Sequence, residues 1–462
     1  MRPSRRSPQV ALVIVALALG VAVPACSEDA PTPAPAPGVV KDPPGTMPLC
    51  AAPTGPGTEH QGSLAADEVW TAATGPHVIT SALSIGAGRT LTIEACAVVR
   101  LKGNTGVLVE GRLLTNGIAD KLVRFERADA DVAWASLEAR KGSELRLSHT
   151  TFEGGGNPDG ARLAQVAMLD IRGDQDLAPQ PVLFVDNVGL KGSASLGVQL
   201  REGGAFAPGS TALTIVGSAS FPVSVWARSA GTLPAGDYTG NATDEVFLPA
   251  NGGRDDVRED MTLAARGVPY RIGGEPGGSS FVVGATSGPS PLLTIEAGVT
   301  LRFAKNARLL VDGTDGKARG ALSAVGTSER PIVFTSAEAS PAPGDWSGLL
   351  VSGAPDPRDA IAHARIAYAG GPSQVSSFGC PSALAKDFGN EGSVVIYGGA
   401  PGSAFVTHTT IENGDGDGIV RGWTGAPVDF LGGNTFTNVA RCWQTFPKPS
   451  VGVCEDPAPC PR

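Results

Sequence analysis

The sequence predicts an all-β solenoid with two related halves, and three observations carry this prediction. The segment Leu91–Leu101 returns about 200 residues later as Leu293–Phe303. Apolar and polar residues alternate within both copies, which is the period of a half-buried strand. Glycine makes up 62 of the 462 residues, which leaves few windows for a long helix. Internal repetition of short strands is typical of solenoid proteins.

The repeat extends beyond these two segments. Further matched positions are Val109–Gly111 with Val311–Gly313, Gly117 with Gly326, and Trp134 with Trp346. We therefore expect a first half over residues 58–246, a junction over residues 247–266 and a second half over residues 267–445. Residues 313–320 and 372–393 break the spacing of the strands, and insertions on solenoids tend to gather on a binding face.

A β-sandwich is the main alternative, because it too can be built from short strands. Sandwich hairpins, however, need two-residue turns between strands of about five residues or more. The strands predicted here are shorter and follow one another steadily along the chain. In a coil whose turns stack, such strands pair with the turns above and below. The pattern therefore favours a right-handed parallel β-helix over a sandwich or a propeller.

A set of segments in both copies carries a resemblance to a known family. They are Val78–Thr80 and Leu91–Ala95 in the first copy, and Gly267–Ile272, Leu293–Phe303, Gly320–Thr327, Pro331–Ser336 and Gly344–Gly348 in the second. On these segments the chain resembles the pectin-lyase-like, right-handed parallel β-helix lipoproteins of bacteria, a family of largely unassigned function. The resemblance spans about residues 76–445 and implies the fold, but no activity. The first copy departs from it, since Cys96 replaces the glycine found at Gly298.

The N-terminus predicts export. Three arginines precede the 14-residue apolar run Val10–Val23, which is too short to span a bilayer but suits a signal peptide over residues 1–25. The segment Val23–Cys26 resembles a lipobox, so we expect Cys26 to be lipidated and the protein to be an outer-membrane lipoprotein on the periplasmic or the surface face. Cleavage at the same bond by an ordinary signal peptidase is the alternative.

Residues 26–57 are expected to be a tether that begins at the lipidated cysteine. Nine prolines fall within residues 27–57, and such a segment is extended and buries no core. The formal charge of the chain is −9, with no basic stripe. This balance argues against nucleic acid as a partner and leaves the lipid anchor as the expected contact with a membrane.

With Cys26 lipidated, six cysteines form an even set for disulfides in an oxidising compartment. The candidates are Cys50, Cys96, Cys380, Cys442, Cys454 and Cys460. Their positions suggest Cys50–Cys96, Cys380–Cys442 and Cys454–Cys460, although Cys96 could instead be a small buried residue. Both open ends of a solenoid need closing. We expect a short helix over Leu64–Ala73 at the first end and the Cys/Pro-rich tail, residues 446–462, at the second.

The sharpest candidate site is the pair Asp415 and Asp417, which glycines separate. Carboxylates spaced in this way can supply hard oxygen ligands for Ca²⁺, whereas the alternative interpretation is a flexible turn. No other cofactor is expected. Two further charged segments are Arg254–Asp260, interpreted as a solvated connection, and the loose acidic loop of Asp170, Asp174 and Asp176, for which the sequence identifies no neighbouring base.

No catalytic residue is assigned, because no nucleophile–base pairing can be argued from the spacings. His149, His363 and His408 recur in similar strand contexts, so we expect them at equivalent points of different turns, stacked for structural reasons. Trp134 and Trp346 could stack against sugar rings, or they could fill the core.

The leading hypothesis is a non-enzymatic, lipid-anchored envelope or surface protein that recognises carbohydrate or envelope partners along the side of the solenoid. A Ca²⁺-assisted polysaccharide lyase or hydrolase is the first alternative, and a purely structural envelope protein is the second. Acidic residues clustered with a basic group in a groove would favour the enzyme. A row of exposed aromatic side chains on one face would favour the binding protein.

Overall fold

The structure is a computed structural model that describes residues 50–157, 166–174, 180–274, 279–314, 317–375, 390–425, 427–445 and 460. All of these belong to the compact unit Leu49–Arg462. The predicted signal peptide, Cys26, most of the tether and most of the C-terminal tail lie outside the described residues. None of the helices in the described ranges has the length and apolar character to cross a membrane.

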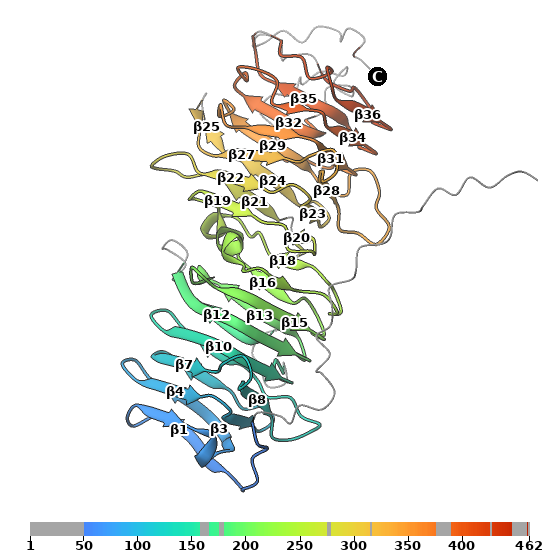
Figure 1. Cartoon of the computed structure of the whole chain (residues 1–462). Helices are drawn as coiled ribbons and strands as arrows, with labels where there is room; N and C mark the ends of the chain where they lie inside the picture. Colours follow the sequence, from blue (N-terminus) through green and yellow to red (C-terminus); the bar gives the residue numbers. More distant parts are fainter. Residues whose placement is uncertain are drawn as a thin grey trace, which may run out of the picture. The chain divides into compact units, whose positions relative to one another are not determined.

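The chain folds as a parallel β-helix in which short strands stack into three columns (Figure 1). In the first half, column 1 contains β2 (Glu68–Trp70), β4 (Thr90–Glu94), β7 (Arg112–Asn116) and the first parts of β10 (Glu144–Glu153) and β12 (Gln180–Lys191). Column 2 contains the first parts of β1 (Thr58–Ser63) and β3 (His77–Ile85), then β5 (Val98–Leu101), β8 (Val123–Arg127), the later parts of β10 and β12, β15 (Thr211–Val216) and β17 (Gly236–Asp237). The strand β14 (Gly204–Phe206) pairs with the start of β12.

Column 3 runs through both halves of the chain. Its first part contains the ends of β1 and β3, then β6 (Val107–Val109), β9 (Leu137–Ala139), β11 (Ala167–Arg172), β13 (Leu196–Arg201), β16 (Val223–Val225) and β18 (Val246–Leu248). It continues with β20 (Tyr270–Ile272), β23 (Thr300–Phe303), β28 (Ile332–Ser336), β31 (Ala364–Ala367), β34 (Thr410–Glu412) and β36 (Thr435–Thr437).

In the second half, two separate five-stranded sheets accompany column 3, so that each turn again has three columns. One contains β19 (Met261–Leu263), β22 (Leu292–Ile295), β27 (Ala321–Val325), β30 (Ala360–Ala362) and β33 (Val406–Thr407). The other contains β21 (Ser280–Val283), β24 (Arg308–Val311), β29 (Gly348–Gly353), β32 (Gly392–Gly398) and β35 (Asp417–Gly422). Three short 3₁₀ turns occur in the described chain: η1 (Ala72–Thr74), η2 (Ala227–Thr232) and η3 (Gly253–Asp255).

The core lies inside the coil, where alternate residues of each strand stack on those of the next turn. One such row in column 3 consists of Ile85, Val109, Ala139, Ile171 and Leu200, each of which is 0% exposed. Burial of each large aliphatic side chain contributes about 1.5–3 kcal/mol. Because the backbone groups of each strand pair with two neighbours, strands of three residues are sufficient.

The predicted junction is continuous with the stack, since β18 pairs with β16 on one side and with β20 on the other. The two copies of the sequence repeat nevertheless do not begin in the same column. β5 and β23 are matching segments of the sequence repeat, yet β5 lies in column 2 and β23 continues column 3. Matching segments of the two copies are therefore shifted by one column around the coil.

The insertions predicted from strand spacing lie where expected. Gly313–Thr314 (β25) and Lys317–Ala318 (β26) form an antiparallel hairpin on the coil. Rung length also varies widely: the paired residues Val223 and Val246 are 23 positions apart, whereas Ile366 and Ile411 are 45 apart. The longer rung contains the predicted insertion at 372–393, most of which lies outside the described residues.

The helix predicted over Leu64–Ala73 is wrong. This segment contains β2 and the beginning of η1. Trp70 in β2 pairs with Ile93 in β4, and its side chain is 2% exposed. Pairing with the next rung therefore overrides the local helical preference.

The disulfides confirm one predicted pair and overturn two. Cys50 and Cys96 are bonded, with Cα atoms 5.3 Å apart. Cys96 has a positive φ of 65°, as its counterpart Gly298 does at 88°, so the cysteine occupies a turn position that favours glycine. Cys442 is bonded to Cys460, so the predicted pairs Cys380–Cys442 and Cys454–Cys460 are wrong. Cys380 and Cys454 lie outside the described residues.

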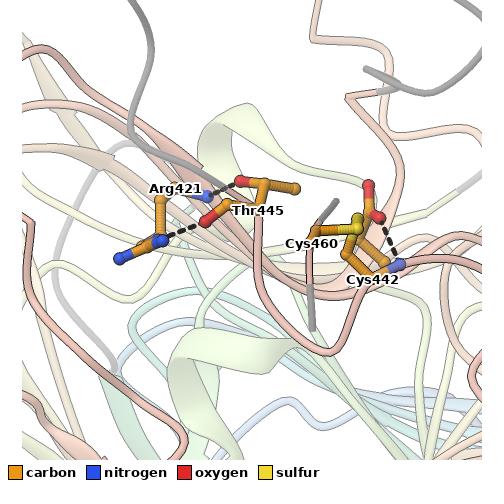
Figure 2. Close-up of a disulfide and its surroundings, with 5 residues drawn as sticks. Arg421, Cys442, Thr445 and Cys460 are labelled. Atoms are coloured by element: carbon orange, nitrogen blue, oxygen red, sulfur yellow. Dashed lines mark hydrogen bonds between the residues drawn. A yellow bond between two sulfur atoms is a disulfide. The ribbon is translucent and has the colours of Figure 1, made fainter. Parts of the chain in front are cut away.

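The second end of the coil is fastened beside this disulfide (Figure 2). The carboxylate of Asp417 accepts a hydrogen bond of 2.9 Å from the backbone N–H of Cys442. The backbone N–H of Arg421 donates to Thr445 Oγ1 over 2.9 Å, and the Arg421 guanidinium donates to the Thr445 carbonyl. Cys442 is thus held by β35 at the point where it bonds to Cys460. Nearness in sequence favours Cys454 as the partner of Cys460 instead.

Candidate functional site

The three recurrent histidines share one turn conformation, as their similar sequence contexts predict, but they do not all lie at the same corner of the coil. His149 lies between columns 1 and 2, whereas His363 and His408 each lie just before a strand of column 3. His149, His363 and His408 all have positive φ, at 45°, 48° and 48°, and histidine is one of the residues that tolerates this region. The rings of His363 and His408 stack with their centroids 5.0 Å apart. A Cβ on Gly117 would lie 2.2 Å from the carbonyl oxygen of His149, and one on Gly326 would lie 2.5 Å from that of His363. Both glycines are needed for this close approach.

The matched tryptophans fill the core. Trp134 and Trp346 are each 0% exposed. The indole N–H of Trp134 donates to the carbonyl of Glu153, and that of Trp346 donates to the carbonyl of Ala367, both over 2.9 Å. The alternative role for these two side chains, stacking on sugar rings, is therefore wrong.

The predicted calcium ligands are placed differently from one another. Asp415 is exposed, whereas Asp417 is buried at the start of β35 and accepts the hydrogen bond from Cys442. Across the described ranges, no group of three or more His, Cys, Asp or Glu side chains is arranged to hold a metal ion. The calcium site stays a prediction.

The charged segment Arg254–Asp260 is not simply a solvated connection, because Asp255 is only 3% exposed. Its carboxylate lies near the backbone N–H groups of Ala227, Arg228 and Asn251, but within the described part of the chain neither oxygen accepts a hydrogen bond, and burial raises its pKa to about 7. The turn η3 directs this side chain inward, while Arg258, Glu259 and Asp260 remain exposed. A run of mixed charges in the sequence does not reveal which side chain faces the interior.

The acidic loop expected around Asp170 is also different. Asp170 lies within β11, on the outer side of column 3, and its Oδ1 accepts a hydrogen bond from Arg201 Nε over 2.8 Å. Asp174 forms an ion pair with Lys141. Both carboxylates therefore have basic partners from neighbouring turns, which the sequence could not identify. Asp176 lies outside the described residues.

Asp170 and Arg201 belong to a network of charges on the outer side of four successive turns of column 3. We call this network the charged strip; it consists of Glu110, Glu138, Arg140, Asp170, Arg172, Arg201 and Glu202. The strands β9, β11 and β13 position it, because Glu138 pairs in register with Asp170, and Arg172 with Arg201. Successive turns lie about 4.8 Å apart, so similar side chains recur at that spacing.

Two of the three arginines of the charged strip, Arg140 and Arg172, each bridge two carboxylates. Arg140 contacts Glu138 at 3.1 Å through Nε and Glu110 at 3.4 Å through Nη1. Arg172 contacts Glu202 at 2.6 Å through Nη2 and Glu138 at 3.9 Å through Nη1. Two-sided pairing of this kind holds the guanidinium planes in place and leaves some of their N–H groups available.

The strip is partly open to solvent. The side chains of Arg140 and Arg172 are 46% and 33% exposed, and that of Glu138 is 29% exposed. Asp170 is more deeply buried, and burial raises its pKa, although the hydrogen bond from Arg201 opposes this effect. The result is a fixed array of charged donors and acceptors, repeated from turn to turn.

An aromatic group lies at the end of the strip. Trp226 follows β16 one turn beyond Arg201, and the Arg228 guanidinium lies 5.9 Å from its ring centroid. Phe221, which precedes β16, stacks on Phe247 with the ring centroids 5.0 Å apart. Trp226 is partly exposed, so it could add an apolar contact to a ligand lying on the strip.

The charged strip presents both kinds of hydrogen-bonding group that a hydroxyl-rich ligand would need. Guanidinium groups donate and carboxylates accept hydrogen bonds, and a sugar hydroxyl needs both kinds of partner. The strip is not apparent from the sequence because its members come from turns of unequal length. The alternating outward positions of Glu138 and Arg140, and of Asp170 and Arg172, were the available signal.

Comparisons with known proteins agree with the fold. Residues 280–373 match the model of the pectate-lyase-like beta helix domain. No curated protein and no solved structure matches the chain. The match lies in the second half, whereas the charged strip lies in the first.

Proposed function

We propose that this parallel β-helix protein is a non-enzymatic protein of the cell envelope that recognises a glycan along the charged strip. The observation that carries the proposal is the ordered row of paired guanidinium and carboxylate groups, repeated at about the 4.8 Å rung spacing. The anchor is the lipidated Cys26, and the Pro-rich tether would hold the β-helix away from the membrane. Carboxylates engaged with arginines in this way support binding rather than proton transfer.

The alternatives make different demands on the molecule. A Ca²⁺-assisted lyase requires a metal-binding acid cluster next to a free base, and Asp415 and Asp417 are its candidates. A purely structural protein requires neither. If the protein binds a glycan along the strip, a substitution within the strip should weaken the complex, whereas loss of an ion pair elsewhere should not.

The substitution Arg172→Gln is expected to weaken glycan binding by about tenfold or more, because a hydrogen bond from a charged group contributes about 1.5–3 kcal/mol. Arg172 holds Glu138 and Glu202 in place, so its loss also disorders both carboxylates. Affinity electrophoresis of the full chain carrying Cys26→Ser, in gels containing a panel of polysaccharides, measures this effect.

The control is Arg365→Gln. Arg365 forms an ion pair with Glu412 on the outer side of column 3 in the second half. This substitution therefore removes an arginine–carboxylate pair that lies away from the strip. Equal weakening by both variants would count against the strip. Shortening of the glycan during the run would indicate the lyase, and no retardation with any glycan would favour the structural protein.

A further inference from the structure

The first turn of the β-helix encloses a cluster of aromatic side chains. The indole of Trp70 stacks on the imidazole of His77, with centroids 4.7 Å apart and planes 6° apart. The ring of His60 lies 3.9 Å from that of Trp70 and 5.2 Å from that of His77. His77 is 2% exposed. The interior at this end is therefore filled by two titratable rings in place of aliphatic side chains.

The hydrogen bonds of the cluster determine its protonation. His77 Nε2 lies 3.0 Å from the carbonyl oxygen of Thr71, which can only accept, so Nε2 carries a proton. His77 Nδ1 lies 3.0 Å from His60 Nε2. In the neutral cluster His77 Nδ1 is the acceptor and His60 Nε2 the donor. A proton added to His77 Nδ1 would face the N–H of His60 and break this bond.

One carboxylate faces the cluster. Glu68 Oε2 lies 3.9 Å from His60 Nδ1 and accepts a hydrogen bond of 2.8 Å from the Trp70 indole. Burial is the main cause that lowers the pKa of both His60 and His77. The negative charge of Glu68 acts in the opposite direction on both rings and raises their pKa. A single carboxylate that is already hydrogen-bonded to Trp70 does not compensate two imidazolium charges.

The strand β1 depends on this cluster. Of its five side chains only that of His60 is not exposed. Among the described residues β1 pairs with β3 alone, so it lies at the edge of the stack. If His60 leaves the interior, β1 loses its one inward-facing side chain and is held by its backbone hydrogen bonds to β3 and by peripheral contacts such as that of Thr58 Oγ1, which donates to the carbonyl of Thr74 over 2.8 Å.

We propose that the His60–His77–Trp70 cluster is a pH-sensitive closure of the first turn, which releases β1 from β3 when the two imidazoles take up protons. The sign follows from the neutral cluster. Both rings bind protons more readily when β1 is open, so closure is complete above about pH 6.5 and is lost as the pH falls below it. For each proton taken up on opening, the opening constant rises about tenfold per pH unit.

Hydrogen exchange of the full chain, followed by mass spectrometry between pH 7.5 and pH 4.5, tests the closure. After correction for intrinsic exchange rates, protection of residues 58–63 and 77–79 is expected to fall by at least about tenfold. Peptides that cover β22 and β23 should keep their protection. A uniform loss along the chain, or no loss at any pH, would overturn the proposal.

Each of two variants removes one titrating ring. His77→Gln keeps an acceptor and a donor, and His60→Phe keeps the stacking on Trp70, so each should show a smaller acid-induced loss than the parent, and the double variant should show none. The exposed His408→Gln is the matched control and should behave like the parent. An acid-induced loss in the double variant that equals that of the parent would refute the role of the cluster. If both exchange rapidly at every pH, NMR titration of the parent decides, because a pKa of both rings at or above 6.5 contradicts the closure.

Discussion

The substitution Asp255→Asn is expected to stabilise the β-helix by about 4 kcal/mol at pH 8 and to have little effect at pH 4. Asp255 is 3% exposed, and burial raises its pKa from 3.8 to about 7. Because the folded state binds this proton more tightly than the unfolded chain does, ionisation of Asp255 costs stability as the pH rises from 4 to 7. The amide removes that cost because it carries no charge, and it keeps one of the two acceptor oxygens.

Urea unfolding at pH 4 and pH 8 measures this effect. Glu259→Gln is the matched control, because Glu259 lies in the same charged segment but is exposed. The parent should lose stability between the two pH values, and Asp255→Asn should lose less. A variant that is no more stable than the parent at pH 8 would show that the carboxylate is compensated in the folded protein.

The substitution Trp346→Ala is expected to destabilise the protein by about 3–5 kcal/mol, the usual cost of removing a buried aromatic side chain. Trp346 stacks on Phe303 with centroids 4.2 Å apart, and its indole donates to the carbonyl of Ala367. Removal leaves a cavity and a buried carbonyl without its donor. Urea unfolding measures the loss of stability.

The partly exposed Trp226 provides the comparison for Trp346. Trp226→Ala should cost less stability and should weaken glycan binding, because Trp226 lies at the end of the charged strip. Trp346→Ala should leave glycan affinity unchanged at temperatures where it is folded. Weaker binding by folded Trp346→Ala would contradict its assignment to the core.

The interior of the fold could be predicted from the sequence because each turn obeys the same local rule. Alternation places residues such as Leu301 and Phe303 inside, and both are 0% exposed. The turn positions of His149, His363 and His408 could also be predicted, since similar sequence contexts produce the same positive φ. These features depend on neighbours within a few residues.

The outer surface could not be predicted in the same way. Which side chains meet there depends on the number of residues in each turn, and that number varies between turns. Arg172 and Glu202 are 30 positions apart, whereas Arg365 and Glu412 are 47 apart. The His60–Glu68 contact was missed for another reason: a polar cluster inside a coil departs from the apolar rule that defines the interior.

The shift of one column between the two copies has a consequence for how their sequences can differ. Inner positions face the same surroundings in both copies, and selection can keep them alike. Outer positions that correspond in sequence point away from one another, because β5 and β23 belong to different columns. A molecule that contacts one side of the protein would therefore constrain outer residues of one copy and not the matching residues of the other. Cys96 and Gly298 differ in this way: the two occupy the same positive-φ turn, but only Cys96 forms a disulfide.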